Sequence, residues 1–599
     1  MPSFGLVGPT YALSSPNLDA QRAINVYPEV IESGSGKSKI ALRGTPGIHT
    51  WATLPTAPVR GLWAGENRLF AVGGDTLYEV SDAGVATSLG DVGDDAQHTP
   101  VQIWPNGNQL MIVSAGLLYI HTGVELIQPA FHTATGRVNT SGSDVLRTYG
   151  DEFGNWIEGA QILIDGTSYT VATVADVNNL TVTGTPGTQF DKEYAIAPGG
   201  DADADGTLLT WHAGDLFAPT MVGHPITVSG TEYTVATFED ERHIRLDDEV
   251  PGAGPIIWWA LPPVTARTGT FLDGYFIANP PDSKQFFFSA LNDGKVWDPL
   301  EYSTKEGYPD NIAAIYSDHE ELWLFGTHRS IEVWRNEGDR DAAGGFRRDP
   351  GAFIHCALVA PWSVCSLATG LHFLGGDVNG RIVAYRAQGF QPVRVSNHAV
   401  EQAWNAYDTV WDAFAYTYTD EGHPFWVISF MTENATWVYD LSTQMWHERA
   451  YWDGSAYHKH RGRCYAFVFG MNLVGDHTNG KIYEMSTAFY DDDGAAIRRQ
   501  RTAPHISVEE SRTFFHRLQL DLEVTTPSKP SVTLDWSNDD GATWSAGQAR
   551  APSLATSKKG RVIWNRLGSG RDRIYRITIT DQVQVAIADA YLQASPGAH

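Results

Sequence analysis

The sequence predicts an all-β fold: a β-propeller that contains two small inserted β modules and is followed by a β-sandwich. Short runs rich in Val, Ile, Tyr, Trp and Phe alternate with turns along a chain that contains 59 Gly and 31 Pro. A hairpin unit recurs along the chain, and one stretch is repeated in tandem between two of its copies. Helical periodicity is almost absent, and residues 396–408 are the clearest helix candidate.

The recurring unit is an apolar strand, a turn of Gly, Asn or Asp, and a second strand that contains an aromatic residue. Hairpins of this kind form the blades of β-propellers, at about 40 to 50 residues per repeat. A β-sandwich array would show similar hairpins and is the alternative. The copies lie at Asn67–Tyr78, Asn108–Tyr119, Tyr275–Ser289, Glu321–Trp334, Leu371–Tyr385, Phe425–Tyr439 and Asn472–Tyr483.

Two copies of a second pattern interrupt the propeller repeats. The first copy contains Gly166-Thr-Ser-Tyr-Thr-Val-Ala-Thr, and the second, 64 residues later, contains Gly230-Thr-Glu-Tyr-Thr-Val-Ala-Thr. Alternating apolar positions precede both copies. We therefore predict two tandem β modules, at 136–195 and 196–258, that form an outward appendage able to fold by itself.

The remaining boundaries follow from these repeats. Residues 1–58 are predicted as an N-terminal arm, residues 59–135 and 259–495 as the propeller core, and residues 496–599 as a C-terminal β-sandwich. The last segment has alternating strands and is of the usual size for a sandwich.

Charge and composition exclude several classes of protein. The formal net charge is −28, and half of that excess lies in residues 136–258, which hold 19 acidic and 5 basic side chains. This charge argues against a protein that binds nucleic acid over its whole surface, because phosphate binding needs clustered cations. We expect no membrane span, no secretory signal, and buried reduced thiols at Cys356, Cys365 and Cys464.

An Asp-box pattern, S-x-D-x-G-x-T-W, occurs near the C-terminus. Its positions are Ser537, Asp539, Gly541 and Trp544. We expect a structural hairpin turn in which Asp caps backbone amides and Gly takes a positive φ. Sialidases have several such boxes on propeller blades, but the box contains no catalytic group, and one full copy is present here.

The other candidate sites are weaker. Asp201, Asp203 and Asp205 resemble the start of a calcium loop, but His212 stands where an EF-hand needs Glu, so a solvated linker competes with a weak calcium site. His447, His458 and His460 cluster in a basic stretch, which opposes metal binding. Asp412 and Glu421 cannot be assigned acid and base roles from sequence. We predict no catalytic residues, no metal site and no cofactor.

Several segments resemble the tail-hub (nozzle), or packaged-DNA stabilisation, proteins of short-tailed bacteriophages. The resemblance covers most of the chain outside the insertion, including the segment from Pro309 to Trp334, and the acidic modules depart from it. Its structural motif positions are Asn25, Tyr27, Pro28, Pro46 and Gly47 near the start, and Trp564, Gly568 and Arg571 near the end.

This resemblance implies a non-enzymatic virion component assembled in the host cytoplasm. Proteins of that family form a ring, usually a hexamer, below the portal and its adaptor ring. The ring closes the DNA channel and carries the tail needle or fibres. An acidic wall suits such a channel, because it repels the phosphates of double-stranded DNA that must slide past without binding.

Two further hypotheses concern surfaces. The basic run Lys558, Lys559 and Arg561 predicts a contact with an acidic neighbouring subunit or ring, with a solvated loop as the alternative. A glycan-binding or glycan-cleaving propeller used for host attachment is the alternative function, suggested by the Asp box and by 20 Trp residues, whose rings could stack on sugars.

Overall fold

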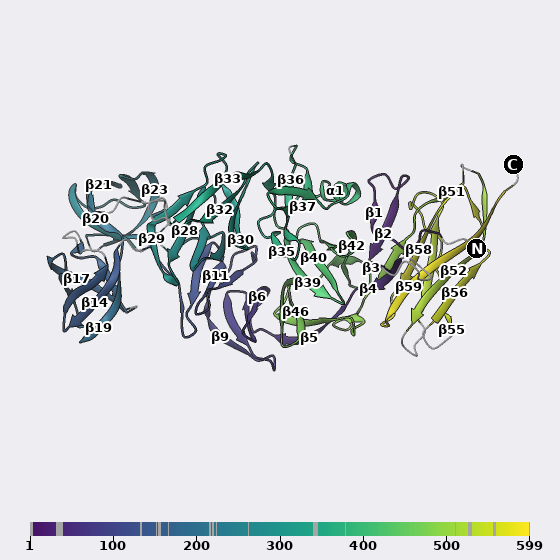
Figure 1. The fold of residues 1–599 in the computed structure, drawn as a ribbon, viewed down its shortest axis with the longest axis horizontal. Helices are drawn as coiled ribbons and strands as arrows, with labels where there is room; N and C mark the ends of the chain where they lie inside the picture. The colour runs from purple at the N-terminus through teal and green to yellow at the C-terminus, as the bar shows by residue number, and fades with distance from the viewer. Residues whose placement is uncertain are drawn as a thin grey trace. The chain divides into compact units, whose positions relative to one another are not determined.

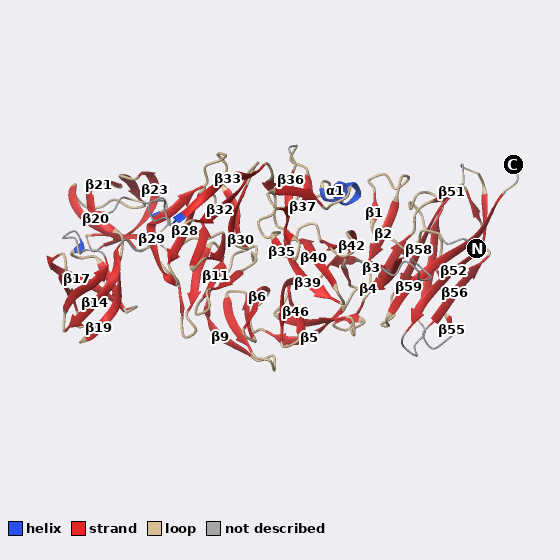
Figure 2. Cartoon of the chain, in the orientation of Figure 1, coloured by secondary structure: helices blue, strands red, loops and turns tan. Residues whose placement is uncertain are grey.

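The computed structural model confirms the all-β prediction (Figures 1 and 2). It describes residues 4–31, 40–131, 134–150, 153, 157–165, 167–214, 217, 221–222, 224–229, 231–260, 263–338, 345–377, 379–508, 511–524, 530–554 and 559–597. Strands make up 61% of the chain and helix 2%. Among the described residues, no helix is long and apolar enough to cross a membrane.

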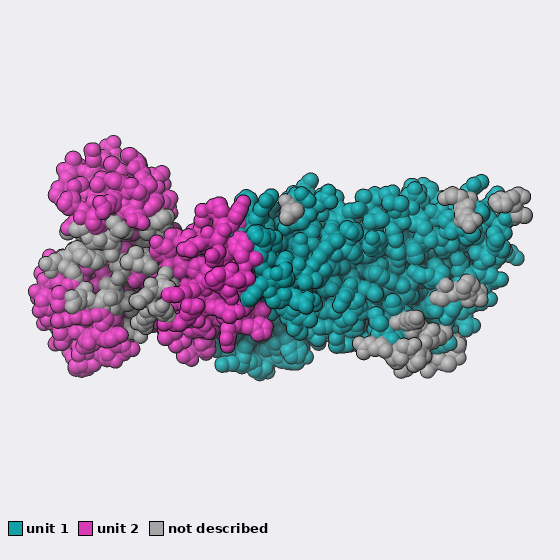
Figure 3. Space-filling model, turned by 45° about the horizontal axis from the view of Figure 1, so that its top comes forward, with its two compact units in different colours: residues 1–101, 326–331, 354–599 teal, residues 102–325, 332–353 magenta. Residues whose placement is uncertain are grey.

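The chain divides into two compact units (Figure 3). Unit 1 comprises residues 1–101, 326–331 and 354–599, and unit 2 comprises residues 102–325 and 332–353. Four blade-like sheets and the sandwich strands belong chiefly to unit 1. Three blade-like sheets and the two inserted modules belong chiefly to unit 2.

Each of the seven predicted hairpins forms the central pair of strands of one blade-like sheet. Antiparallel neighbours extend each pair to about four strands, as a propeller blade requires. The sheets in unit 1 are β6 (Val59–Gly65), β7 (Arg68–Gly73), β8 (Thr76–Val80) and β9 (Ala86–Asp91); β34 (Ala357–Leu358), β35 (Cys365–Leu367), β36 (Gly370–Gly376), β37 (Ile382–Gln388) and β38 (Gln391–Arg394); β39 (Phe414–Asp420), β40 (His423–Phe430), β41 (Ala435–Asp440) and β42 (Met445–Glu448); and β45 (Gly462–Val468), β46 (Met471–Asp476) and β47 (Lys481–Ser486) with β5 (Gly47–Thr53).

The sheets of unit 2 follow the same pattern. They are β10 (Gln102–Pro105), β11 (Leu110–Ser114), β12 (Leu117–His121) and β13 (Leu126–Ile127); β26 (Thr268–Leu272), β27 (Tyr275–Asn279), β28 (Gln285–Ala290) and β29 (Asp293–Thr304); and β30 (Ile312–Asp318), β31 (Glu321–Gly326), β32 (Ile331–Asn336) and β33 (Phe346–Ile354).

Strand β5 completes a sheet formed by residues more than 400 positions later in the chain. Its residues Ile48 and Ala52 pair with Met485 and Ile482 of β47. A shared apolar cluster that includes Val59 then joins this sheet to the β6–β9 sheet. Residues 47–53 therefore belong to a blade, and not to an arm that ends at residue 58.

Two closed six-stranded barrels occupy the inserted region. Their strand orders are equivalent, and each encloses its own apolar cluster. An isolated antiparallel β-bridge between Ala130 and Pro263 holds the two ends of the insertion together. The first barrel has β14 (Ala134–Ser141), β15 (Asp144–Gly150), β16 (Gln161–Ile164), β17 (Thr167–Asp176), β18 (Asn179–Thr183) and β19 (Gln189–Ile196); the second has β20 (Gly199–Asp205), β21 (Leu208–Gly214), β22 (Pro225–Val228), β23 (Thr231–Asp240), β24 (His243–Leu246) and β25 (Gly254–Ala260).

The C-terminal strands form two sheets around a core that contains Trp564 and Tyr575, and strands from the N-terminal segment enter both sheets. One sheet contains β1 (Tyr11–Ala12), β2 (Ala20–Ile24), β50 (Arg499–Thr502), β51 (Ile506–Ser507), β53 (Val532–Ser537), β54 (Gln548–Arg550) and β58 (Asp572–Ile579), and it continues from β2 into β42 of the β39–β42 sheet through a parallel pairing of Ile24 with Glu448. The other contains β3 (Val26–Val30), β4 (Ile40–Gly44), β52 (Thr513–Val524), β55 (Ser553–Leu554), β56 (Lys559–Asn565), β57 (Ser569–Gly570) and β59 (Val585–Pro596).

The remaining elements are small. Helix α1 (His398–Trp404) lies inside the predicted range, and its N-cap Asn397 accepts a hydrogen bond from the Val400 amide at 3.0 Å. Cys356 and Cys365 are buried free thiols, and Cys464 is half-buried. Two short hairpins complete the description, β43 (Ala450–Trp452) with β44 (Tyr457–Lys459), and β48 (Asp491–Asp492) with β49 (Ala495–Ala496).

Candidate functional site

The Asp-box turn joins β53 to β54 in the sandwich. Asp539 accepts hydrogen bonds from the Ser537 hydroxyl at 2.6 Å and from the Thr543 amide at 2.9 Å, and these bonds lower the pKa of its carboxyl to about 2. Gly541 has φ +88°, a conformation that L side chains rarely adopt. Trp544 lies against the guanidinium of Arg576, whose Cζ is 3.9 Å from the ring centroid. The contacts are those of a tight structural turn.

The side chain of Arg573 holds this turn through several hydrogen bonds, and no sequence motif predicted that role. Its side chain is buried, and it donates to Asn538 Oδ1 at 2.8 Å and to the carbonyl oxygens of Leu567 at 2.5 Å and Ser569 at 3.2 Å. Its guanidinium also lies over the Phe515 ring at 4.3 Å. One buried cation thus ties the Asp box to the turn at residues 567–569. The sequence of an alternating strand does not show whether the side chain of a basic residue faces the core.

The predicted basic contact lies at the start of β56. Lys558 is outside the described residues; Lys559 is exposed and opposes Glu523 across the sheet. Arg561 Nε lies 3.7 Å from Oδ1 of the buried Asp521, so Arg561 also serves the subunit's own fold. Trp564 and Leu567 are buried in the core, and the Trp564 indole donates to the Gln548 carbonyl at 2.9 Å.

The N-terminal motif positions lie where β2, β3 and β5 meet later parts of the chain. Asn25 is buried with φ +56°, and its side-chain amide exchanges hydrogen bonds with Ala450 and donates to the Arg498 carbonyl. Tyr27 and Pro28 are buried on β3. The Pro46 carbonyl accepts from Arg449 at 3.0 Å. A Cβ on Gly47 would lie 2.4 Å from the Asp491 carbonyl oxygen, so this position requires glycine.

Two of the C-terminal motif positions lie in exposed backbone next to strands. Gly568 has φ +77° in an exposed turn, and Arg571 is exposed one residue before β58.

The three clustered histidines do not converge on one point. His447 is buried between Tyr27 and Phe425, with ring centroids 5.8 and 5.9 Å away, and burial lowers its pKa to about 3. His458 Nε2 lies 2.8 Å from an oxygen of Asp453. His460 is buried, and burial lowers its pKa well below the usual value. These contacts are those of structural histidines.

The candidate carboxylates are also separated. Asp412 accepts hydrogen bonds from Thr432, and Glu421 forms an ion pair with Arg43, so each has its own partner. Asp201, Asp203 and Asp205 lie on strand β20, where they alternate with the buried Ala202 and Ala204. Extended backbone places such alternate positions roughly 7 Å apart, so the three do not form the loop that a calcium site of that type needs.

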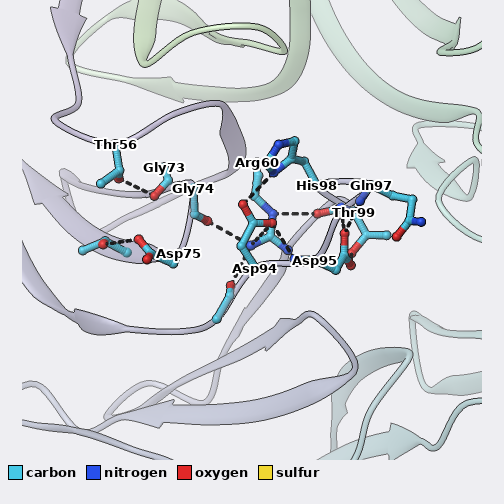
Figure 4. A network of polar contacts seen from close by, with 12 residues as sticks. Thr56, Arg60, Gly73, Gly74, Asp75, Asp94, Asp95, Gln97, His98 and Thr99 are labelled. Atoms are coloured by element: carbon cyan, nitrogen blue, oxygen red, sulfur yellow. Dashed lines mark hydrogen bonds and ion pairs between the residues drawn. The ribbon is translucent and has the colours of Figure 1, made fainter.

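A polar network surrounds Arg60 in unit 1 (Figure 4). The Arg60 side chain is buried and donates to the carbonyl oxygens of Gly74, Gly93 and Thr99 at 2.7 to 3.0 Å, and it forms an ion pair with Asp94. Asp95 accepts from the amides of Gln97 and Thr99. The network holds the loop that follows β9 and has the character of a structural support.

The sequence matches two parts of one family. Residues 10–183 and 264–490 match "Bacteriophage P22 Gp10, beta-propeller", and residues 498–595 match "Bacteriophage P22 Gp10, beta-sandwich". The propeller match alone includes more than half of the 599 residues. It extends through most of the first barrel, to residue 183, and its gap at 184–263 covers the end of that barrel and the whole of the second.

Similarities to solved structures are weak. The N-terminal domain of Nup159 is 10% identical, with 78% of this chain and 98% of that chain covered and a TM-score of 0.32. The WD40 domain of SCAP from fission yeast is 9% identical, with 74% and 98% covered and a TM-score of 0.28. The designed Ika8 protein is 11% identical, with 73% and 99% covered and a TM-score of 0.29. A comparison with curated proteins found no match.

The family assignment therefore rests on the sequence matches, which agree with the order of propeller and sandwich along the chain. The chain belongs to the bacteriophage P22 Gp10 family, and is a structural tail protein of a short-tailed phage.

Proposed function

We propose that this protein is the tail hub, or nozzle, of its phage. Identical subunits, six in the expected ring, lie below the portal and its adaptor ring, close the DNA channel and conduct the DNA, and anchor the tail needle or fibres. The observation that supports this role is the family match over both the propeller and the sandwich.

The charge of the chain is compatible with that role. A net charge of −28 disfavours tight binding of DNA, which a channel must let slide. Net negative charge also promotes solubility, so the assembly and not the charge is the property to test.

Imaging of purified tails tests the proposal. We expect a ring of this protein between the portal adaptor and the needle or fibres, and a multiple of the 65.7 kDa subunit mass for the assembled recombinant protein. A protein that stays monomeric and is absent from that position in virions would refute the hub role.

Subunit contact through the start of β56 is part of this proposal. Because Lys559 is exposed on the sandwich, replacing it with Glu should slow ring assembly, more at low salt than at high salt. Reversal of Arg561 would disturb the buried Asp521, and Lys559→Glu places a second carboxylate opposite Glu523, so the melting transition of the variant is measured beside its assembly rate. Arg550→Glu, an exposed reversal on β54, is the matched control. Equal assembly rates for both variants would favour the solvated-loop alternative.

A glycan-binding role is the second candidate, now for the first inserted barrel. Tyr149 on β15 and Phe190 on β19 are 74% and 72% exposed, and both strands pair with β14. Exposed aromatic rings of this kind can stack on sugars. If the barrel serves host attachment, Tyr149→Ala and Phe190→Ala should abolish retention on host surface polysaccharide, whereas Trp411→Ala, another exposed aromatic, should not. Unchanged retention would remove this candidate.

A further inference from the structure

Three side chains with metal-binding atoms meet beside the Asp-box turn. One donor atom from each of His505, Asp540 and Asp572 lies within 4.8 Å of the other two. Strand β58 pairs with both β51 and β53, and this pairing brings the three together. His505 directly precedes β51, Asp540 lies in the turn after β53, and Asp572 begins β58.

The contacts of His505 leave Nδ1 as the ring nitrogen that faces the carboxylates. Its Nε2 lies 2.7 Å from the carbonyl oxygen of Pro16, and because a carbonyl can only accept, Nε2 must be protonated. Its Nδ1 lies 2.7 Å from Asp572 Oδ2. A bare lone pair on Nδ1 would repel an anionic oxygen at this distance, so the two atoms either share a proton, on the ring or on the carboxyl, or both ligate one metal ion.

The carboxylates distinguish these two possibilities. Asp572 Oδ1 is buried and has no hydrogen-bond partner. Among the described residues, neither Asp540 nor Asp572 forms an ion pair with a lysine or arginine. Two carboxylates this close repel one another, and one proton on His505 neutralises only one of them. A divalent cation would balance both charges and would give Asp572 Oδ1 a partner.

We propose that His505 Nδ1 and one oxygen each from Asp540 and Asp572 bind a divalent transition-metal ion such as Zn²⁺ or Mn²⁺. A mixed set of one imidazole and two carboxylates suits these ions better than Ca²⁺ or Mg²⁺, which prefer oxygen ligands alone. The bond from Nε2–H to the Pro16 carbonyl is the outer contact that metal-binding histidines commonly make. The ion ties the N-terminal segment and the Asp-box turn to β58. The site is independent of the hub role.

Calorimetric titration of the full chain with ZnCl₂ alone or MnCl₂ alone, after chelator treatment, tests the site. We expect one binding event that His505→Ala and Asp540→Asn each weaken by at least about tenfold, together with a metal-dependent rise in the melting temperature that both variants lose. His516→Ala is the matched control, since His516 is exposed on the same domain and bonds to the Ser595 hydroxyl. MgCl₂ should produce neither effect.

Two results would overturn the proposal. One is equal metal affinity in the wild type, His505→Ala and Asp540→Asn. The other is no metal response in the wild type; a higher melting temperature for Asp540→Asn would then show that Asp540 only repels Asp572. If His505→Ala fails to fold, the half-buried Asp540→Asn still decides between the outcomes.

Discussion

At the scale of single residues, buried arginines hold turns together in this protein. Arg60 donates to carbonyls of the loop after β9 and of the turn between β7 and β8, and Arg573 donates to carbonyls beside the Asp box. A guanidinium offers five donors in a planar fork, so one side chain can satisfy several carbonyl oxygens that would otherwise be buried without partners.

Replacement of Arg573 by Met should destabilise the sandwich strongly. The change leaves Asn538 Oδ1 and the carbonyls of Leu567 and Ser569 without their donor, and we expect the free energy of unfolding to fall by about 3 kcal/mol. Chemical denaturation monitored by tryptophan fluorescence would measure it. Arg550→Met, on the exposed edge strand β54, should change stability by less than about 0.5 kcal/mol. Equal effects of the two substitutions would contradict this role of Arg573.

Buried His447 should make the fold sensitive to mild acid. Its folded pKa of about 3 lies below the unfolded value near 6.5, so between these pH values the unfolded chain binds a proton that the folded chain does not. The free energy of unfolding therefore falls as the pH drops below 6.5. His447→Phe should retain the packing with Tyr27 and Phe425 and should remove up to about 2 kcal/mol of the loss between pH 6.5 and pH 5.

Guanidinium unfolding at several pH values measures this slope, with His516→Ala as an exposed control. Asp492 acts in the opposite direction, because burial raises the pKa of its carboxyl to about 6 and its contribution is lost as the pH rises through that value. A His447→Phe variant with the wild-type slope would show that His447 is not the group responsible.

At the scale of elements, β5 joins the start of the chain to the last blade-like sheet. It pairs with β47 along its length and also contacts β48. Pairing with this distant strand covers the edge of β47 that would otherwise be unpaired.

Gly47 is the point where this closure is most sensitive to substitution. In Gly47→Ala the new methyl group would lie 2.4 Å from the Asp491 oxygen and 2.8 Å from the Phe489 oxygen, both in the backbone. We expect a loss of about 2 kcal/mol in stability, measured by thermal unfolding. Gly376→Ala on β36, whose nearest neighbour would lie 3.4 Å away, is the control and should be nearly neutral.

At the scale of the whole molecule, the inserted barrels should be removable. Each barrel closes on itself and has its own apolar cluster, and the Ala130–Pro263 bridge already places the flanking backbone side by side. Joining Phe131 to Pro263 through an Asn-Gly linker should leave a soluble chain with cooperative unfolding.

Solubility and the melting transition of this deletion variant provide the measurement. Deleting one barrel at a time, with the cut at residues 197–198 between them, would show whether either is needed alone. Loss of soluble protein in every deletion would mean that the barrels are integral to the fold.

The sequence alone predicted most of the architecture, because the patterns that encode it are local. Period-two alternation and turn residues are sufficient to locate the hairpins centred near Gly74 and Gly116, the tandem modules and the α1 helix capped by Asn397. The family resemblance depended on short motifs of the same kind, and the family match confirmed it.

Only the tertiary structure decided which distant segments meet. The pairing of β5 with β47 and the entry of β2 to β4 into the sandwich sheets leave no local trace, since any alternating strand can pair with many others. For the same reason, neither the inward-pointing Arg573 nor the meeting of His505, Asp540 and Asp572 was predicted. Both features depend on side chains that come from separate strands. The order of the strands in the sheets brings these side chains together, and that order is set by the packing of the whole core.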